Sequence, residues 1–348
     1  MSLFFELIQV ALGNRERLDR TPTDEEWAAM FEESFRQAVT GVMLDGIEKL
    51  PEEQRPPIDL LLEWIGETQI NEETVTLHLK RARELTKDFM AVGFRSCVLK
   101  GVGIATLYPN PLRRVCGDID LWMNGRRTEV MKWLRTKYDI SEVRWHHVDA
   151  LIFDDVQTEI HFHATWLFNP FRNRRLQRYL EKEKLAQMKE RPEGFGYPSA
   201  EFNVVYSLVH SFHHLLECGI GFRHVIDYYY VVRKLKMENG ELIIKEAAET
   251  IKSIGLYKFL GAMMYVLKEA CGATEEMLLC PIDEVEGRFL LSEIVAAGNF
   301  GHERIGEEMP TNSLVRFRTM VKHYPSEIIW MLPWKVWHWC WRIWHRNK

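Results

Sequence analysis

The sequence lacks a strong excess of either charge, a paired-cysteine spacing and a long uncharged apolar run. Its 348 residues include 45 Lys and Arg against 50 Asp and Glu, which gives a net charge of −5. A dedicated nucleic-acid-binding protein needs a broad basic surface, so this composition argues against one. Hydrophobic residues make up 46% of the chain, enough for substantial cores in about two domains.

The cysteines and the first residues carry no sign of export. The six cysteines, at positions 97, 116, 218, 271, 280 and 340, include no Cys-x-x-Cys pair. The opening residues Met-Ser-Leu-Phe-Phe lack the basic start and the long apolar core of a signal peptide. We therefore expect a reduced, cytoplasmic protein without a signal peptide.

Two acids lie one residue apart in the apolar stretch 117–122 (Gly-Asp-Ile-Asp-Leu-Trp). Because a strand alternates its side chains, Asp118 and Asp120 would share one face while Ile119 and Leu121 enter the core. Adjacent like charges are costly, and Mg²⁺, which prefers carboxylate oxygens and substrate phosphates, commonly relieves that cost. The spacing therefore predicts a divalent-metal site on this face.

A third acid occurs in the alternating stretch 155–163 (Asp-Val-Gln-Thr-Glu-Ile-His-Phe-His). The alternation predicts a half-buried strand whose polar face carries Glu159 and His161. Because Mg²⁺ prefers oxygen, His161 is more typical of a hydrogen-bonding neighbour of the third carboxylate than of a metal ligand. Two Mg²⁺ ions held by three carboxylates activate an attacking hydroxyl and neutralise a leaving pyrophosphate.

These motifs resemble the polymerase-β-like nucleotidyltransferases, and within them a branch of uncharacterised bacterial members. The branch has a Leu-Lys-Gly turn, a helix that ends near Tyr-Pro, an Arg, an Asp-x-Asp strand and an acid-x-His strand. The counterparts here are Leu99-Lys100-Gly101, Tyr108-Pro109, Arg113 or Arg114, Asp118-Ile119-Asp120 and Glu159-Ile160-His161. The resemblance covers roughly residues 25 to 305, and the motif core is its specific part.

The resemblance implies an α/β (α+β) fold, in which a small mixed sheet is flanked by N-terminal and C-terminal helical regions. It implies an enzyme that uses Mg²⁺, or Mn²⁺, to move a nucleoside monophosphate from a nucleoside triphosphate to an unidentified hydroxyl or phosphate acceptor. Asp118, Asp120 and Glu159 would bind the metal, and Glu159 would also be the general base. The residues that would hold the triphosphate are Lys100, Gly101 and one of Arg113 and Arg114.

The sequence departs from the superfamily in the turn after Lys100. The usual Gly-Ser or Gly-Gly is Gly101-Val102 here, so no hydroxyl lies beside Gly101 to contact a phosphate. Gly103 would share that contact through the loop backbone. The connection from Gly101 to Asp118 is also longer than usual, and the donor base and the acceptor stay open.

Each motif also has a simpler interpretation. Asp-x-Asp pairs are common in turns and at solvated strand edges, Lys100 can be a surface residue at a strand end, and the two arginines can balance local acids. Two other classes of protein therefore stay open. One is a catalytically inactive nucleotide-binding or regulatory module, and the other is a toxin-like or membrane-tethered interaction protein.

Four regions are predicted along the chain: an N-terminal helical region at 1–92, a nucleotidyltransferase core at 93–168, a C-terminal helical domain at 169–328 and a tail helix at 329–348. In the first region Thr23 would cap a helix, and a long helix would run over 58–91. In the core we expect strands at 96–99, 117–123, 140–146, 149–153 and 156–163, and helices at 103–108 and 126–137.

A histidine-rich stretch at 209–214 and an Arg-His-Val-Ile-Asp stretch at 223–227 resemble the helices that follow the catalytic sheet in this branch. His210 and His214 have the spacing of two zinc ligands on one helix face, but no Glu, Cys or third His completes a zinc site. We expect His210 and Asp227 to contact the base, the ribose or the acceptor in a cleft between domains, with packing as the alternative.

The tail holds six of the twelve tryptophans and has no acid after Glu327. A 4-3-4-3 spacing puts five of them on one helical face: Trp330, Trp334, Trp337, Trp341 and Trp344. A cationic, Trp-rich helix suits peripheral contact with the inner face of a membrane through residues 330–346. The alternative, which we favour, is packing against another helix or a second copy of the chain in an oligomer.

Overall fold

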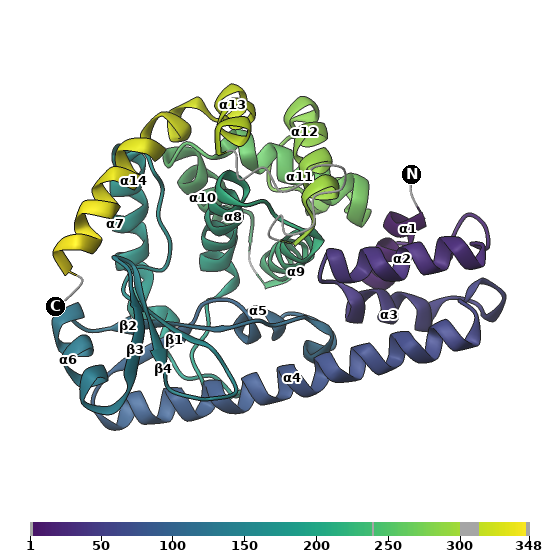
Figure 1. The fold of residues 1–348 in the computed structure, drawn as a ribbon. Helices are drawn as coiled ribbons and strands as arrows, with labels where there is room; N and C mark the ends of the chain where they lie inside the picture. Colours follow the sequence, from purple (N-terminus) through teal and green to yellow (C-terminus); the bar gives the residue numbers. More distant parts are fainter. Residues whose placement is uncertain (1–2, 239, 300–312, 346–348) are drawn as a thin grey trace. The chain divides into compact units, whose positions relative to one another are not determined.

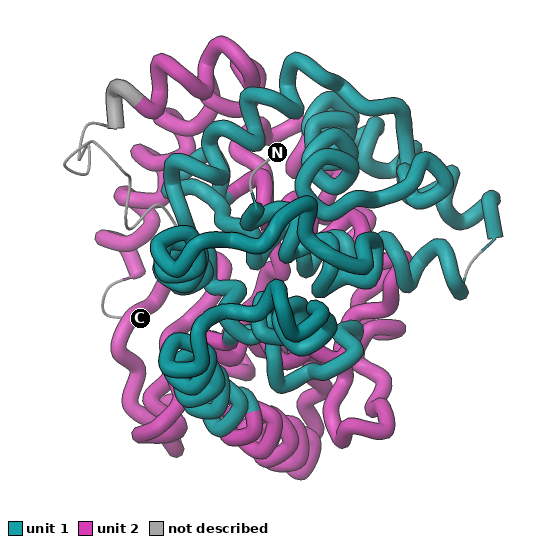
Figure 2. Tube along the Cα trace, turned by 90° about the vertical axis from the view of Figure 1, so that its right-hand side faces the viewer, with its two compact units in different colours: residues 1–75, 107–115, 214–311 teal, residues 76–106, 116–213, 312–348 magenta. Residues whose placement is uncertain are grey.

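The computed structural model of the chain describes residues 3–238, 240–299 and 313–345 (Figure 1). The chain falls into two compact units, each of which combines segments that are distant in sequence (Figure 2). Unit 1 comprises residues 1–75, 107–115 and 214–311, and unit 2 comprises residues 76–106, 116–213 and 312–348. The division into four consecutive regions stays a prediction.

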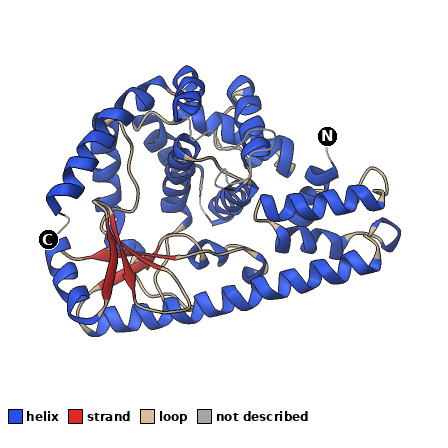
Figure 3. Cartoon of the chain, in the orientation of Figure 1, coloured by secondary structure: helices blue, strands red, loops and turns tan. Residues whose placement is uncertain are grey.

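Unit 2 contains a mixed five-stranded sheet, drawn in red in Figure 3. Its strands are β1 (Arg95–Val98), β2 (Ile119–Asn124), β3 (Asp139–Val143), β4 (His147–Leu151) and β5 (Thr158–His161). They lie in the order β1-β2-β5-β4-β3, with β2 and β5 parallel and every other pair antiparallel. The predicted α+β fold with a small mixed sheet is confirmed.

Helices surround the sheet of unit 2. They are α5 (Val102–Ala105), α6 (Arg127–Lys137), α7 (Pro170–Gln187), α13 (Ser313–His323), α14 (Pro325–His345) and parts of α4 (Ile58–Ala91) and α8 (Ala200–Glu217). Trp122 of β2 stacks on Phe202 of α8, with ring centroids 5.7 Å apart. Phe89 of α4 contacts Trp133 of α6 at 4.8 Å. Buried aromatic pairs of this kind fix how the helices pack in the unit.

Unit 1 consists of helices and short turns in the residues described. The helices are α1 (Leu3–Leu12), α2 (Asp24–Arg36), α3 (Thr40–Lys49), the start of α4, α9 (Phe222–Glu238), α10 (Glu241–Ser253), α11 (Tyr257–Cys271) and α12 (Glu284–Ala297), with 3₁₀ turns η1 (Glu52–Gln54), η2 (Pro111–Arg113) and η3 (Glu275–Met277). A Cβ on Gly287 of α12 would lie 2.3 Å from the Tyr265 side chain of α11. Glycine therefore allows these two helices to pack closely.

Three helix predictions are confirmed and a fourth is too long. The helix predicted at 126–137 is α6. Thr23 caps α2 in a capping box with Glu26, and α4 spans the predicted residues 58–91. The helix predicted at 103–108 ends at Ala105. Pro109 disfavours a helical conformation at the residue before it, and the Thr106 hydroxyl donates to the Gly103 carbonyl at 2.7 Å.

The strand predicted at 149–153 begins two residues earlier, at His147. The Arg144 amide donates to the His147 carbonyl at 3.0 Å and closes a tight turn between β3 and β4. The turn ends β3 at Val143, before the predicted end at 146. The shift brings His147 into the sheet.

Helix α14 packs Trp334 against aromatic side chains of unit 2 and leaves an apolar stripe exposed. Trp334 stacks on Trp166, with ring centroids 5.7 Å apart, and lies 6.2 Å from Trp145. Trp334 therefore packs against other side chains of its own unit. The exposed stripe has a 3-4-3-4 spacing and consists of Ile329, Leu332, Val336, Trp339 and Ile343. Among the residues described, no helix combines the length and the apolar character needed to cross a bilayer.

Candidate active site

Three carboxylates lie side by side across the sheet of unit 2. Asp120 in β2 is the register partner of Glu159 in β5, and Glu159 is also the partner of Asp149 in β4. Register partners in neighbouring strands point to the same face of a sheet. Trp122, two residues after Asp120, shares this face and is covered by Phe202 of α8.

Asp118 lies one residue before β2 and completes the group of acids predicted from the sequence. Oxygen atoms of Asp118, Asp120 and Glu159 all lie within 4.8 Å of one another. Asp120 is fully buried, and the other two are partly exposed. The structure therefore brings together the three acids that sequence analysis selected.

Lys100 supplies positive charge to this group. Its Nζ lies 3.1 Å from Asp120 Oδ2 and 3.9 Å from Asp118 Oδ2. Burial opposes the charged amine, but Asp118, Asp120 and Glu159 outweigh it and raise the pKa of Lys100. Burial also opposes ionisation of Asp120, but Lys100 and His161 outweigh it and hold its pKa below the usual range. Lys100 and Asp120 are therefore both charged at neutral pH.

The turn after Lys100 depends on two glycines. Gly101 has φ 57° and ψ −123°, a conformation that side chains disfavour, and a Cβ there would lie 3.2 Å from the Asp118 carbonyl oxygen. A Cβ on Gly103 would lie 2.4 Å from the Val98 carbonyl oxygen. The Gly103 amide donates to the Lys100 carbonyl at 2.9 Å, so the predicted phosphate contact through this amide requires that bond to break.

His161 lies between two of the acids. Its Nε2 is 2.8 Å from Asp120 Oδ1 and 3.1 Å from Glu159 Oε2, and its Nδ1 is 3.4 Å from the His163 carbonyl oxygen. Burial would lower the pKa of His161, but its hydrogen bonds to the two carboxylates raise it to about 9. Without a bound metal ion, His161 is therefore a cationic neighbour of the acids at neutral pH.

The donor set of the acids fits a hard divalent cation. Mg²⁺ and Mn²⁺ take carboxylate oxygens, and Asp118, Asp120 and Glu159 offer one each within a span that a single ion can bridge. Asp120 Oδ2 is buried and makes no hydrogen bond of good geometry in the described part of the chain, although Lys100 is close. A buried carboxylate oxygen of this kind is stabilised by a cation.

Sequence analysis missed two residues of this face. His147 is the register partner of His161, and Asp149 is the partner of Glu159. His147 Nε2 lies 3.2 Å from Asp149 Oδ1, and its Nδ1 lies 3.3 Å from Glu159 Oε2. Polar and apolar residues alternate at 147–150, and this pattern could have placed both residues on the polar face. The strand predicted to start at 149 left the first half of the pattern out.

Arg114 and Asp227 form a buried pair in unit 1. The Arg114 guanidinium donates to Asp227 at 2.9 Å and 2.7 Å, and the Tyr108 hydroxyl donates to Asp227 at 2.7 Å. The side chains of Arg114 and Asp227 are 6% and 9% exposed. Two parallel N–H···O bonds are the strongest arrangement that an arginine and a carboxylate form.

Arg113 lies among acids of the same unit. Its closest nitrogen-to-oxygen distances are 3.3 Å to Asp45, 3.0 Å to Glu48 and 3.0 Å to Glu72. Both candidate arginines therefore have carboxylate partners within unit 1. His210, on the part of α8 that belongs to unit 2, stacks on Tyr206 at 5.8 Å. The nucleotide contacts assigned to Arg113, Arg114, His210 and Asp227 stay predictions.

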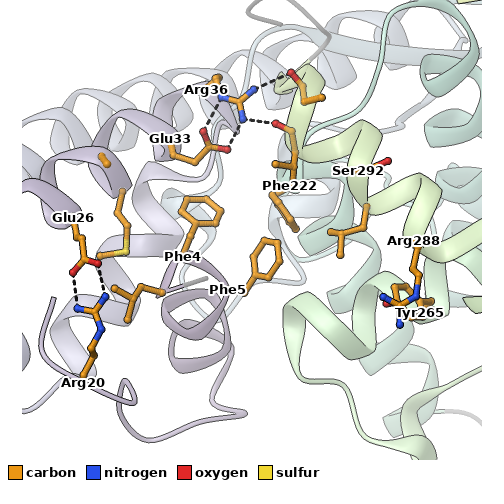
Figure 4. A pocket seen from close by; sticks show the side chains of 16 residues that line it. Phe4, Phe5, Arg20, Glu26, Glu33, Arg36, Phe222, Tyr265, Arg288 and Ser292 are labelled. Carbon is orange, nitrogen blue, oxygen red and sulfur yellow. Dashed lines mark hydrogen bonds and ion pairs between the residues drawn. The ribbon is translucent and has the colours of Figure 1, made fainter. Parts of the chain in front are cut away.

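Unit 1 also contains a pocket of about 1070 Å³ that is lined mainly by apolar side chains, among them Phe4, Phe5 and Phe222 (Figure 4). Each arginine of the lining has a carboxylate partner, as where Arg36 binds Glu33 at 2.6 Å. The pocket therefore offers apolar surface rather than a site for phosphate or a metal ion.

The family follows from the sequence match. Residues 23–272 match the model of a family described as uncharacterised nucleotidyltransferases, a span of more than half of the chain. The chain belongs to this family. The matched span includes Lys100, the three clustered acids and the buried Arg114–Asp227 pair. The assignment made from its motifs is confirmed.

Other comparisons add little to this nucleotidyltransferase assignment. A solved structure of an antigenic nucleotidyltransferase-like protein from Paracoccidioides brasiliensis is 12% identical, with a TM-score of 0.29. The match covers 50% of this chain and 87% of that protein. Similarity at this level supports no conclusion about function. No curated protein matches the chain.

Proposed function

We propose that the chain is a Mg²⁺-dependent enzyme, with Mn²⁺ as an alternative ion, that transfers a nucleoside monophosphate from a nucleoside triphosphate to a hydroxyl or phosphate acceptor. The observation that carries the proposal is the group formed by Asp118, Asp120 and Glu159, whose oxygens lie within 4.8 Å beside Lys100. When bound, Mg²⁺ would neutralise the triphosphate and the leaving pyrophosphate.

The reaction assigns a separate task to each of these residues. An acceptor oxygen forms a bond to the α-phosphorus, and the bond from that phosphorus to the bridging oxygen breaks, which releases pyrophosphate. Asp118 and Asp120 would bind the metal ion. Glu159, which is partly exposed, would share that ion and take the proton that an acceptor hydroxyl loses.

For the triphosphate we propose Lys100 rather than either arginine. Lys100 is at the edge of the acid group, and its side chain is 20% exposed. Its ammonium can exchange a carboxylate oxygen for a phosphate oxygen without leaving the site. Arg114 already binds Asp227, and Arg113 already binds three acids of unit 1. A phosphate would first have to displace these partners.

The main alternative is a nucleotide-binding module that has lost catalysis. The intact acids argue against this alternative. Carboxylates within 4.8 Å repel one another, and a module without metal chemistry has no bound ion to offset that repulsion. Within the residues that the structure describes, no side chain identifies the donor base or the acceptor. Small molecules, polysaccharide precursors, peptides, proteins and RNA therefore remain acceptor classes to test.

The test compares the wild type with Asp120→Asn. Calorimetry and thermal shift with each of the four ribonucleoside triphosphates, with and without Mg²⁺, should show Mg²⁺-dependent binding of one nucleotide by the wild type. Asp120→Asn has the same shape but no charge, so it should remove this binding and any release of pyrophosphate without unfolding the chain.

Asp155→Asn is the matched control. Asp155 lies in the same sequence region as Glu159 but is exposed, and it binds Arg81 at 2.6 Å rather than Lys100. This variant should bind nucleotide as the wild type does. Pyrophosphate release retained by Asp120→Asn, or a folded wild type that binds none of the four nucleotides, would overturn the proposal.

A further inference from the structure

The face of the sheet that carries the acids also carries two buried imidazoles. His147 in β4 and His161 in β5 are register partners, and their ring centroids lie 5.1 Å apart. One ring nitrogen of each histidine and one oxygen of Glu159 lie within 4.8 Å of one another. His147 extends this group toward β4, whereas Asp118 and Asp120 lie on the β2 side of Glu159 and His161 lies between Asp120 and Glu159.

His147 is the member of this group whose polar atoms are least well satisfied. It is 4% exposed, yet neither ring nitrogen makes a hydrogen bond of good geometry within the described residues. Both nitrogens nevertheless lie 3.2–3.3 Å from carboxylate oxygens of Asp149 and Glu159. Asp149 Oδ1 is likewise buried without a hydrogen bond. Orphaned polar atoms inside a protein are costly. A cation held by His147 Nδ1 and Glu159 would satisfy that nitrogen and leave Nε2 to donate to Asp149.

His161 has the orientation of a metal ligand. Its Nδ1 lies 3.4 Å from the His163 carbonyl oxygen, so its Nε2 points toward the carboxylates. Histidines that bind metals commonly donate their second ring N–H to a backbone carbonyl, which fixes the ring and leaves the other nitrogen for the ion. The second shell that such a site needs is therefore already in place.

We propose that His147, His161 and Glu159 form a second cation position, which takes a divalent transition-metal ion such as Zn²⁺. Two imidazole nitrogens and one carboxylate are typical ligands of Zn²⁺ and Fe²⁺, whereas Mg²⁺ prefers a set of oxygens. Asp149 lies beside His147 and would orient it. Glu159 belongs to both positions, so the two ions would be neighbours. The inference shares Glu159 with the proposed function but concerns metal binding in the absence of nucleotide.

The test titrates the full chain with Zn²⁺ and, separately, with Mg²⁺ by calorimetry. His147→Gln should weaken Zn²⁺ binding by at least about tenfold, because it removes a nitrogen ligand, and should leave Mg²⁺ binding unchanged. His163→Gln is the matched control, because His163 is on the same sequence stretch but its Nδ1 contacts Gln177 Oε1 at 3.2 Å. It should change neither affinity.

Asp118→Asn should have the converse effect, weakening Mg²⁺ binding and leaving Zn²⁺ binding intact. X-ray absorption at the zinc edge of the wild type should show two imidazole ligands. This measurement does not depend on whether a variant folds. A shell without imidazole, no stoichiometric Zn²⁺ binding, or equal losses in His147→Gln and His163→Gln would overturn the inference. Normal Zn²⁺ binding by a chain that binds no nucleotide would overturn only the proposed function.

Discussion

Asp120 of β2 and Glu159 of β5 are register partners in the parallel pair at the centre of the sheet. Asp149 continues the row in β4, so three carboxylates lie across adjacent strands. Like charges this close repel one another, and the side chains that offset them are Lys100, which is 3.1 Å from Asp120, and His161, which contacts both Asp120 and Glu159. The properties of the site therefore depend on which cation neutralises each part of the row.

Replacing Lys100 should separate metal binding from nucleotide binding. Lys100→Met removes a positive charge 3.1 Å from Asp120 Oδ2, so a divalent cation should bind the acids more tightly. The same change removes the proposed partner of the triphosphate, so nucleotide affinity should fall by about tenfold or more. Calorimetry with Mn²⁺ alone, and then with Mn²⁺ and nucleotide, measures both effects.

Lys132→Met is the control for this prediction, because Lys132 is an exposed residue of α6. It should change neither affinity. A fall in Mn²⁺ affinity in Lys100→Met would contradict the prediction, since it would mean that Lys100 holds the acids in place rather than competing with the metal ion.

Much of this site could be predicted from the sequence because its acids and His161 lie in, or directly before, alternating strands. The spacing of Asp118, Asp120, Glu159 and His161 shows which side chains share a face, and each pattern is local. His147 was missed for a physical reason. Two consecutive histidines precede Val148, and only the turn closed by Arg144 decides which of them enters the strand on the polar face.

The partners of the arginines could not be predicted in the same way. Arg114 binds Asp227 and Arg113 binds Asp45, and both pairs join residues that are far apart in sequence. Acids and arginines carry no periodic signal that links such positions, so sequence analysis left the choice between Arg113 and Arg114 open. The same holds for the two units, each of which is assembled from separate segments.

Breaking the Arg114–Asp227 pair should be strongly destabilising. Asp227→Ala leaves a buried guanidinium and the Tyr108 hydroxyl without their acceptor, which should lower the free energy of unfolding by about 3–5 kcal/mol. The double variant Arg114→Met, Asp227→Leu should lose less than Asp227→Ala alone, because it leaves no charge unpaired. Urea denaturation measures both.

The control for the Arg114–Asp227 prediction is Glu53→Ala, which breaks an exposed contact with Arg17 at 3.8 Å in the same unit. Exposed pairs contribute little, so this variant should unfold at nearly the wild-type urea concentration. Losses of the same size in Asp227→Ala and Glu53→Ala would show that burial of the Arg114–Asp227 pair does not matter.

Asp45 should make unit 1 less stable as the pH rises. Burial, only partly offset by Arg113, raises the pKa of Asp45 from its ordinary 3.8 to about 6. The folded state therefore binds this proton more tightly than the unfolded state, and the resulting stability, present at pH 4, is lost as the pH rises to about 6. Asp45→Asn stays neutral, so it should be more stable than the wild type at pH 7, by up to about 3 kcal/mol.

The two proteins should have similar stability near pH 4, where the wild-type carboxyl is protonated. Glu32→Gln changes an exposed acid of α2 in the same unit, and its stability should follow the wild-type pH profile. Urea denaturation at pH 4, 5, 6 and 7 makes the comparison. If Asp45→Asn were the less stable protein at pH 7, the charged Asp45 carboxylate would stabilise the fold by pairing with Arg113 instead of destabilising it.

The inner face of α14 should stabilise unit 2, whereas its exposed tryptophans should not. Trp334 packs on Trp166, Trp145 and Phe168, with ring centroids 5.7 Å, 6.2 Å and 5.3 Å away. Trp334→Ala should therefore lower the free energy of unfolding by about 2–4 kcal/mol and speed hydrogen exchange along α14. Trp344 is 72% exposed, and Trp344→Ala should change stability by less than about 0.5 kcal/mol. Equal losses in both variants would mean that α14 is stabilised through its exposed side, for example by a second copy of the chain, and sedimentation of the wild type would then detect the oligomer.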